Sequence, residues 1–158
     1  MIHETAIIYP GVIIEPNVTI GPYCVIGAPP EWKGKEGQSK GVYIASGTII
    51  HGHVTIDSGA ENVTYIGGNC YIMKHAYIAH DCDIRQNVTI SAGVCLAGHV
   101  SVYEGTNLGM NVCVHQKVKV PSGCMIGMGA VITKKTELKP NSKYAGVPAK
   151  YIGQNIRK

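Results

Sequence analysis

An apolar residue recurs at every sixth position over most of this 158-residue chain. A helix would show spacings of three and four residues, and a half-buried strand would alternate every two. A fixed six-residue period is typical of a β-solenoid, in which each short strand forms one side of a coil. The periodic residues are Ile2, Ile8, Ile14, Ile20, Ile26, Ile44, Ile50, Ile56, Ile66, Ile72, Ile78, Ile84, Ile90, Leu96, Val102, Leu108, Val114, Val120, Ile126, Ile132 and Leu138.

Two further patterns share this period. The residue four positions after each periodic one is small or β-branched, as at Val54 and Val88, which suits a narrow triangular interior. The residue three positions after it is usually Gly or Asn, as at Gly59, Gly93 and Asn111, and these residue types tolerate the positive φ of a corner. With three sides to a coil, residues eighteen apart lie above one another in parallel strands about 4.8 Å apart.

The expected fold is therefore an all-β, parallel β-helix of hexapeptide repeats with about seven coils, in one domain by its length. We expect the helix to span residues 1–144, interrupted by an excursion loop at 27–43 and a bulge at 61–65. Residues 145–158 would form a tail that caps the open end, as the terminal repeats of solenoids do.

The cysteines predict a reduced protein. Of the six, Cys24, Cys70, Cys82 and Cys124 fall on the small inward position, where a thiol acts as a compact hydrophobe. Cys95 and Cys113 are eighteen apart on an outward position and could touch. No signal peptide opens the sequence and no apolar run approaches membrane length, so we expect a cytoplasmic protein with no membrane span.

Positive charge is concentrated toward the end of the chain. The formal net charge is +4, and from Lys117 onward there are nine Lys or Arg residues but one acid, Glu137. Such a region suits a phosphate-bearing ligand or an acidic carrier protein, or it is a solvated surface that maintains solubility. Nucleic-acid binding is not expected, because no aromatic stacking residues are interleaved with the basic ones.

The corner pattern fails along one edge. Titratable residues replace Gly or Asn at four corners that are eighteen apart, and the residues just before them form a second column. Clustered departures from a local rule are expected at functional sites. The first column contains Asp81, His99, Lys117 and Lys135, and the second contains His80, Gly98, Gln116 and Lys134. On the other two edges the corners are mostly Gly or Asn, apart from His53 and His75.

These columns suit acyl transfer. His80 is a candidate general base, because imidazole is matched to proton transfer near neutral pH, and Asp81 would orient it if a corner turns the two side chains together. Gly98, one coil further on, offers a backbone N–H where an oxyanion would develop. His99, His115 and Gln116 would supply nearby donors.

The repeat resembles that of the hexapeptide-repeat acyltransferases, which form left-handed parallel β-helices and usually assemble as trimers. Residues 73–82 (MKHAYIAHDC) and 96–102 (LAGHVSV) resemble the active-site coils of the acyl-carrier-protein-dependent UDP-N-acetylglucosamine O-acyltransferases of lipid A synthesis, as do residues 2–6 and the PPEWK loop. The resemblance implies that His80 is the base, Asp81 its partner and Gly98 the oxyanion donor. It implies acceptor- or donor-pocket roles for His99, His115 and Gln116, and it matches Lys33 or Lys35 to the family's loop lysine. We expect Lys117 and His75 to bind substrate as well.

The sequence also departs from this family. Tyr77 stands where the family carries a second histidine, and a short tail is expected in place of its C-terminal helical domain. The ending YAGVPAKYIG resembles acetyl-CoA-dependent hexapeptide acetyltransferases that act on amino sugars. The sequence therefore leaves two acyl donors, acyl carrier protein and acyl-CoA. Either one is expected to act as a co-substrate and not as a tightly bound cofactor. Its expected binding residues are Lys134, Lys135, Gly146 and Lys150.

The leading hypothesis is acyl transfer from a thioester to a hydroxyl or amine of a nucleotide-activated amino sugar by a homotrimer, with no metal. The acetyl-CoA-dependent sugar acetyltransferases remain an alternative for the donor. A metalloenzyme like the γ-carbonic anhydrases, using His75 and His80, would need a third ligand that is missing in register. A non-catalytic scaffold is the remaining alternative.

Overall fold

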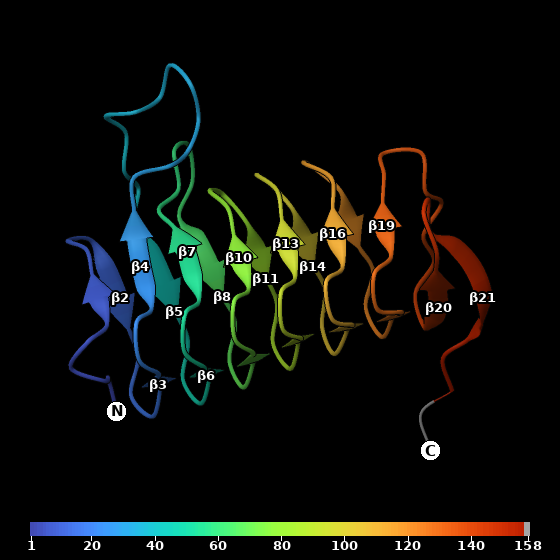
Figure 1. Ribbon diagram of the computed structural model, residues 1–158, viewed down its shortest axis with the longest axis horizontal. Helices are drawn as coiled ribbons and strands as arrows, with labels where there is room; N and C mark the ends of the chain where they lie inside the picture. Colours follow the sequence, from blue (N-terminus) through green and yellow to red (C-terminus); the bar gives the residue numbers. More distant parts are fainter. Residues whose placement is uncertain (157–158) are drawn as a thin grey trace.

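A computed structural model describes residues 1–156 as a three-sided parallel β-helix (Figure 1). Its coils are stacked along one long axis, with the N-terminus at one end and the C-terminal strands at the other. The fold is the parallel β-helix expected from the six-residue period. Residues 1–156 contain no helix that is long and apolar enough to cross a membrane.

Three sheets form the three sides, with seven, six and eight strands. The first sheet contains β1 (Ile7–Ile8), β4 (Val25–Ala28), β7 (Thr55–Asp57), β10 (Tyr77–Ile78), β13 (Cys95–Leu96), β16 (Cys113–Val114) and β19 (Val131–Ile132). The second contains β2 (Val12–Ile14), β5 (Val42–Ile44), β8 (Thr64–Ile66), β11 (Asp83–Ile84), β14 (Ser101–Val102) and β17 (Lys119–Val120). The third contains β3 (Thr19–Ile20), β6 (Ile49–Ile50), β9 (Tyr71–Ile72), β12 (Thr89–Ile90), β15 (Asn107–Leu108), β18 (Met125–Ile126), β20 (Ser142–Ala145) and β21 (Lys150–Gln154).

The strand register confirms the eighteen-residue coil. Ile78 of β10 pairs with Leu96 of β13, and Ile84 of β11 pairs with Val102 of β14, in parallel. The bulge at 61–65 lengthens one coil, so Ile78 pairs on its other side with Ile56. Residues that are far apart in sequence are thereby fixed one above another.

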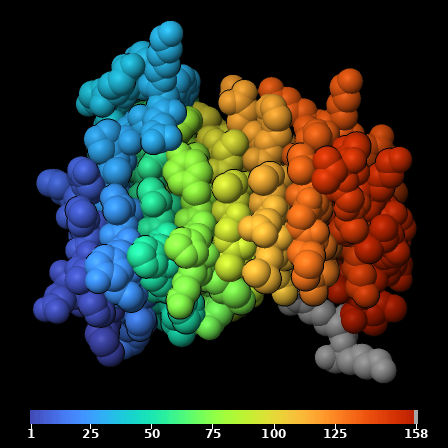
Figure 2. All heavy atoms as spheres, in the orientation of Figure 1, coloured from blue at the N-terminus to red at the C-terminus, as the bar shows by residue number. Residues whose placement is uncertain are grey.

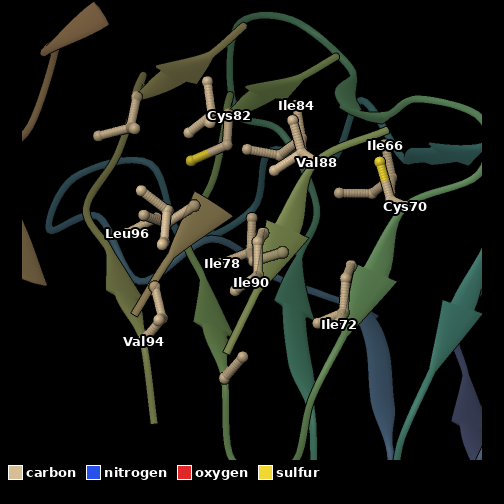
Figure 3. Packing of buried hydrophobic residues seen from close by; sticks show 14 of the residues in the cluster. Ile66, Cys70, Ile72, Ile78, Cys82, Ile84, Val88, Ile90, Val94 and Leu96 are labelled. Atoms are coloured by element: carbon tan, nitrogen blue, oxygen red, sulfur yellow. The ribbon is translucent and has the colours of Figure 1, made fainter. Parts of the chain in front are cut away.

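The periodic residues form one continuous core, part of which is shown in Figure 3. From Ile20 to Ile132 they are fully buried, and the small inward residues pack between them. Burying each Ile or Val side chain stabilises the fold by roughly 1.5–3 kcal/mol. The four inward cysteines are buried, whereas Cys95 and Cys113 are exposed neighbours on β13 and β16; all six thiols are free.

The corners take the left-handed backbone conformation with few exceptions. His53, His75, Asp81, His99 and Lys117 all have φ between 59° and 63°, although this region favours Gly and Asn. The corner pattern was wrong at two positions. Lys135 lies in the corresponding turn without left-handed φ, and in this turn Lys135 N donates to Thr133 Oγ1 while Thr133 N donates to Thr136 Oγ1. Gly59, just before the bulge, also lacks left-handed φ.

The excursion loop leaves β4 and returns at β5 on the edge that also carries the turns after β10 and β13 (Figure 1). In the space-filling view the loop stands above the rest of this surface (Figure 2). At the other end, β20 continues the third sheet, and β21 turns back to pair with it antiparallel. The tail expected over 145–158 includes β21, while its last two residues lie outside the described part of the chain.

Candidate active site

His80 and Asp81 form a hydrogen-bonded pair in the turn between β10 and β11. His80 Nδ1 lies 2.7 Å from Asp81 Oδ2. Adjacent residues can meet in this way because Asp81 has a φ of 60°, which turns its side chain back toward His80, as the sequence required. The side chain of Asp81 is fully buried and that of His80 is 12% exposed. The pair fixes one ring nitrogen and leaves Nε2 available.

The bulge segment holds the Asp81 carboxylate. Backbone N–H groups of Asn62, Glu61 and Ala60 donate to its oxygens at 2.6, 2.9 and 3.2 Å. Burial alone would raise the pKa of Asp81, but the bonds from Asn62, His80, Glu61 and Ala60 outweigh it and hold this pKa below its usual value. Asp81 is therefore an anion that orients the imidazole.

Gly98 lies directly against the imidazole ring. A Cβ at this position would lie 2.4 Å from Cε1 and 2.6 Å from Nε2 of His80, so only glycine leaves room for the ring. The backbone of the next residue ties the coils together, since His99 N donates to His80 O at 3.0 Å. Within residues 1–156 no acceptor is recorded for the Gly98 N–H, so this donor is available to a ligand.

Trp32 of the excursion loop covers the same pair. Its ring stacks on His80 at 4.9 Å between centroids and 24° between planes, and it meets the edge of His99 at 5.6 Å. Lys35 Nζ lies 5.4 Å from the Trp32 ring centroid and 3.9 Å from Glu61 Oε1. The loop thus covers His80 and contacts the bulge that orients Asp81. The break in the period predicted the loop, but it did not indicate which side chain reaches His80.

Hydrogen bonds fasten the end of the loop to the coil beside the bulge. Lys40 N donates to Gly59 O at 2.7 Å, and Gly41 N donates to Ser58 Oγ at 2.8 Å. The hydroxyls of Ser39 and Ser58 are also 2.8 Å apart. The two interruptions of the repeat therefore pack against each other and build one site.

A second polar pair lies on the outer face of β7 and β10. Tyr77 Oη donates to Asp57 Oδ2 at 2.6 Å. Burial, together with the charge of Glu31 in the loop, raises the pKa of Asp57, although the Tyr77 bond and the charge of His80 oppose this shift. Burial and the Asp57 carboxylate also raise the pKa of Tyr77. Tyr77 was noted in the sequence as a departure, whereas Asp57 was missed because it reads as an ordinary strand-end residue.

The remaining predicted residues are placed in four groups. On the same edge beyond Gly98, His115, Gln116 and Lys117 are exposed, and His115 Nδ1 lies 3.2 Å from Gln116 O. His75 is not brought to the His80 edge: it lies before β10 and stacks on His53 at 5.1 Å between centroids. Lys33 is exposed, and it is Lys35 that reaches Trp32 and Glu61. The donor-binding candidates Lys134, Lys135, Gly146 and Lys150 are exposed near the C-terminal end.

That end of the solenoid contains a cavity of about 1000 Å³ between the last turn and the β20–β21 hairpin. Its lining includes Lys135, Lys139 and Lys150 together with Tyr144 and Tyr151. A shallower hollow of about 310 Å³ beside it is lined by Lys117, Lys119 and Lys134, among others. The two hollows share Thr133 and Thr136, which makes a continuous basic surface suited to an anionic ligand.

Comparison with known proteins identifies relatives of similar sequence and fold. The family of bacterial transferase hexapeptides (six repeats) matches residues 1–28 and 64–98. An acyl-[acyl-carrier-protein]–UDP-N-acetylglucosamine O-acyltransferase from Thermodesulfovibrio yellowstonii is 31% identical over 140 aligned residues, which cover 64% of this chain and 54% of that protein. The enzyme of the same name from Caulobacter vibrioides is 35% identical over 98 residues, covering 56% and 37%.

Solved structures extend the likeness to nearly the whole chain. A UDP-N-acetylglucosamine acyltransferase from Bacteroides fragilis superposes with a TM-score of 0.93 at 28% identity, covering 98% of this chain and 60% of that one. The corresponding enzyme from Campylobacter jejuni gives 0.80 at 26% identity, covering 98% and 75%. This chain spans about half the length of the first curated relative. The chain therefore shares the left-handed β-helix fold of these structures, and it is similar in sequence to hexapeptide-repeat transferases and to UDP-N-acetylglucosamine O-acyltransferases.

Proposed function

We propose that this protein transfers an acyl group from a thioester to a hydroxyl or amine of a nucleotide-activated amino sugar, with UDP-N-acetylglucosamine as the first candidate acceptor. The observation that carries the proposal is the His80 imidazole, fixed at Nδ1 by Asp81 and packed against the Gly98 backbone. The names of the relatives support the substrate classes. The reaction would belong to lipid A synthesis in the cytoplasm.

In this mechanism, His80 Nε2 accepts the proton of the acceptor group as its oxygen or nitrogen bonds to the thioester carbonyl carbon. The negative charge that develops on the carbonyl oxygen is stabilised by the Gly98 N–H. When the carbon–sulfur bond breaks, the imidazolium returns its proton to the leaving thiolate. Asp81, an anion throughout, keeps the ring in the required tautomer and stabilises its charged form.

The donor is an acyl carrier protein or an acyl-CoA. Both present phosphate to the protein, and the basic surface that includes Lys134, Lys135 and Lys150 lies on the C-terminal side of His80 along the solenoid. His99, His115, Gln116 and Lys117 are proposed to contact the acceptor from the edge they share with His80. We further propose a homotrimer, because one exposed edge gives little enclosure to a nucleotide sugar.

The direct test incubates the purified protein with UDP-N-acetylglucosamine and either acetyl-CoA or acyl carrier proteins of several chain lengths, and analyses products by mass spectrometry. Acylated nucleotide sugar with one donor class supports the proposal and identifies the donor. No product with any donor, in a protein that remains folded, contradicts it. Sedimentation of the same sample tests the trimer, and a fully active monomer would contradict that part.

A further inference from the structure

Three metal-ligating atoms converge beneath Trp32. His80 Nδ1, Asp81 Oδ2 and His99 Nε2 all lie within 4.8 Å of one another. His80 Nδ1 is 2.7 Å from Asp81 Oδ2, and His99 Nε2 is 3.5 Å from the same oxygen. Glu61 Oε2 approaches from the bulge, 3.8 Å from His99 Nε2. Two imidazoles and the Asp81 carboxylate therefore lie together, with the Glu61 carboxylate next to His99.

The His99 nitrogen is an unsatisfied group in this cluster. His99 Nε2 is buried, yet it has no hydrogen-bond partner within residues 1–156. The distances of 3.5 and 3.8 Å to Asp81 and Glu61 are too long for good hydrogen bonds. A buried polar atom without a partner is costly, and native structures usually satisfy it with a ligand, water or ion.

We propose that this cluster binds a divalent transition metal ion, with Zn²⁺ as the type case, and that the ion inhibits the enzyme rather than assisting it. Imidazole nitrogen and carboxylate oxygen are ligands that Zn²⁺ accepts in tetrahedral sites, whereas Mg²⁺ and Ca²⁺ prefer all-oxygen sites. Glu61 supplies the fourth ligand from the bulge. The N–H groups of Ala60, Glu61 and Asn62 already orient Asp81, as outer-shell donors do for metal-bound carboxylates.

Inhibition follows from the tautomer of His80, and this step rests on the proposed function. A metal ion bound at Nδ1 replaces the proton shared with Asp81, and the neutral ring then carries its proton on Nε2. That nitrogen can no longer accept a proton from the acceptor.

Other histidines provide internal comparisons. His53 and His75 stack on another edge, and within residues 1–156 neither ring forms an ion pair with a carboxylate. The Nε2 of His51 is also buried and has no hydrogen-bond partner in this part of the chain, but its ring neighbour is Tyr71 and no acid of the described residues joins it in a ligand cluster. An unsatisfied nitrogen alone therefore does not make the site; the two carboxylates and the second imidazole distinguish His99.

The test titrates tag-free, metal-free protein with Zn²⁺ by calorimetry, with Mg²⁺ as the control ion. One Zn²⁺ per chain should bind. His99→Asn should lower the Zn²⁺ affinity more than about tenfold, because removing an outer-shell partner of a metal ligand already costs about that much. Asn tolerates the left-handed backbone of His99, so this variant should fold. His53→Asn, with a similar φ, should bind Zn²⁺ like the original protein.

Three results would overturn the site. These are an unchanged Zn²⁺ affinity in His99→Asn, a loss of Zn²⁺ binding in His53→Asn, and no saturable Zn²⁺ binding to the original protein. Because calorimetry needs no substrate, its result is separate from the proposed acyl transfer. Where turnover is measured, Zn²⁺ should lower it in the original protein and in His53→Asn. Full turnover with the site saturated by Zn²⁺ would overturn the inhibitory role.

Discussion

The Cα of Gly98 lies so close to the His80 imidazole that a methyl group there would be 2.4 Å from Cε1. The eighteen-residue coil produces this relationship, since it places Gly98 directly above His80. Glycine has two consequences here: the ring can occupy the site, and the adjacent N–H is not shielded by a side chain.

Gly98→Ala should therefore displace His80 from Asp81. Turnover should fall by roughly 10²-fold or more, because a general base contributes at least about that factor to the rate. The fold should persist, because the added methyl points at a side chain on the edge. Gly37→Ala is the matched control, since a Cβ at Gly37 would meet no atom within 4 Å. Steady-state kinetics would measure the turnover of both variants, and circular dichroism would check that both are folded. Full turnover in Gly98→Ala would show that activity does not depend on the observed position of His80.

Trp32 is the only tryptophan of the chain and stacks on His80, so its fluorescence should report whether that contact persists in solution. Removing the imidazole leaves the indole face without its stacking partner. We therefore expect His80→Ala to change the Trp32 emission at constant pH, whereas His53→Asn should leave it as in the original protein. Identical emission in His80→Ala would mean that the stacking does not persist in solution.

Asp57→Asn should stabilise the protein at neutral pH. Because burial raises the pKa of Asp57, the folded state binds its proton more tightly than the unfolded state. The stability from this group is present at low pH and lost as pH rises through the folded pKa. An amide removes the buried charge and can still accept the Tyr77 bond.

Thermal unfolding across pH measures this gain. Each kcal/mol should raise the Tm by about 2–4 °C in a chain of this size, and the difference from the original protein should shrink as the pH falls. Asp83→Asn, at a partly exposed acid paired with Arg85 at 2.8 Å, should give no such gain. A lower Tm for Asp57→Asn at neutral pH would show that the ionised carboxylate is stabilising.

The period predicted the fold because it fixes which residues are stacked. Once eighteen residues make a coil, the neighbourhood of His80, Gly98 and His99 follows from counting, and the structure brings these three together with Asp81. The same counting places His75 on another edge, at the other end of β10 from His80, and the structure stacks it there on His53. Its expected role in substrate binding stays a prediction.

The two interruptions could be located in the sequence but their contacts could not. Nothing in the pattern indicates that the N–H groups of residues 60–62 turn toward Asp81, or that Trp32 reaches His80, because irregular segments have no register to count. The PPEWK resemblance suggested a lysine in the loop, and the structure adds that Lys35 is the one beside Trp32.

The most direct measurement is the turnover of His80→Ala with the acceptor and donor on which the original protein acts best. We predict a loss of roughly 10²- to 10⁴-fold, the usual contribution of a general base. The fold and the acceptor affinity should be retained, and His53→Asn should stay near full activity. Near-full turnover in His80→Ala would contradict the assignment of the base and favour a scaffold role for this solenoid.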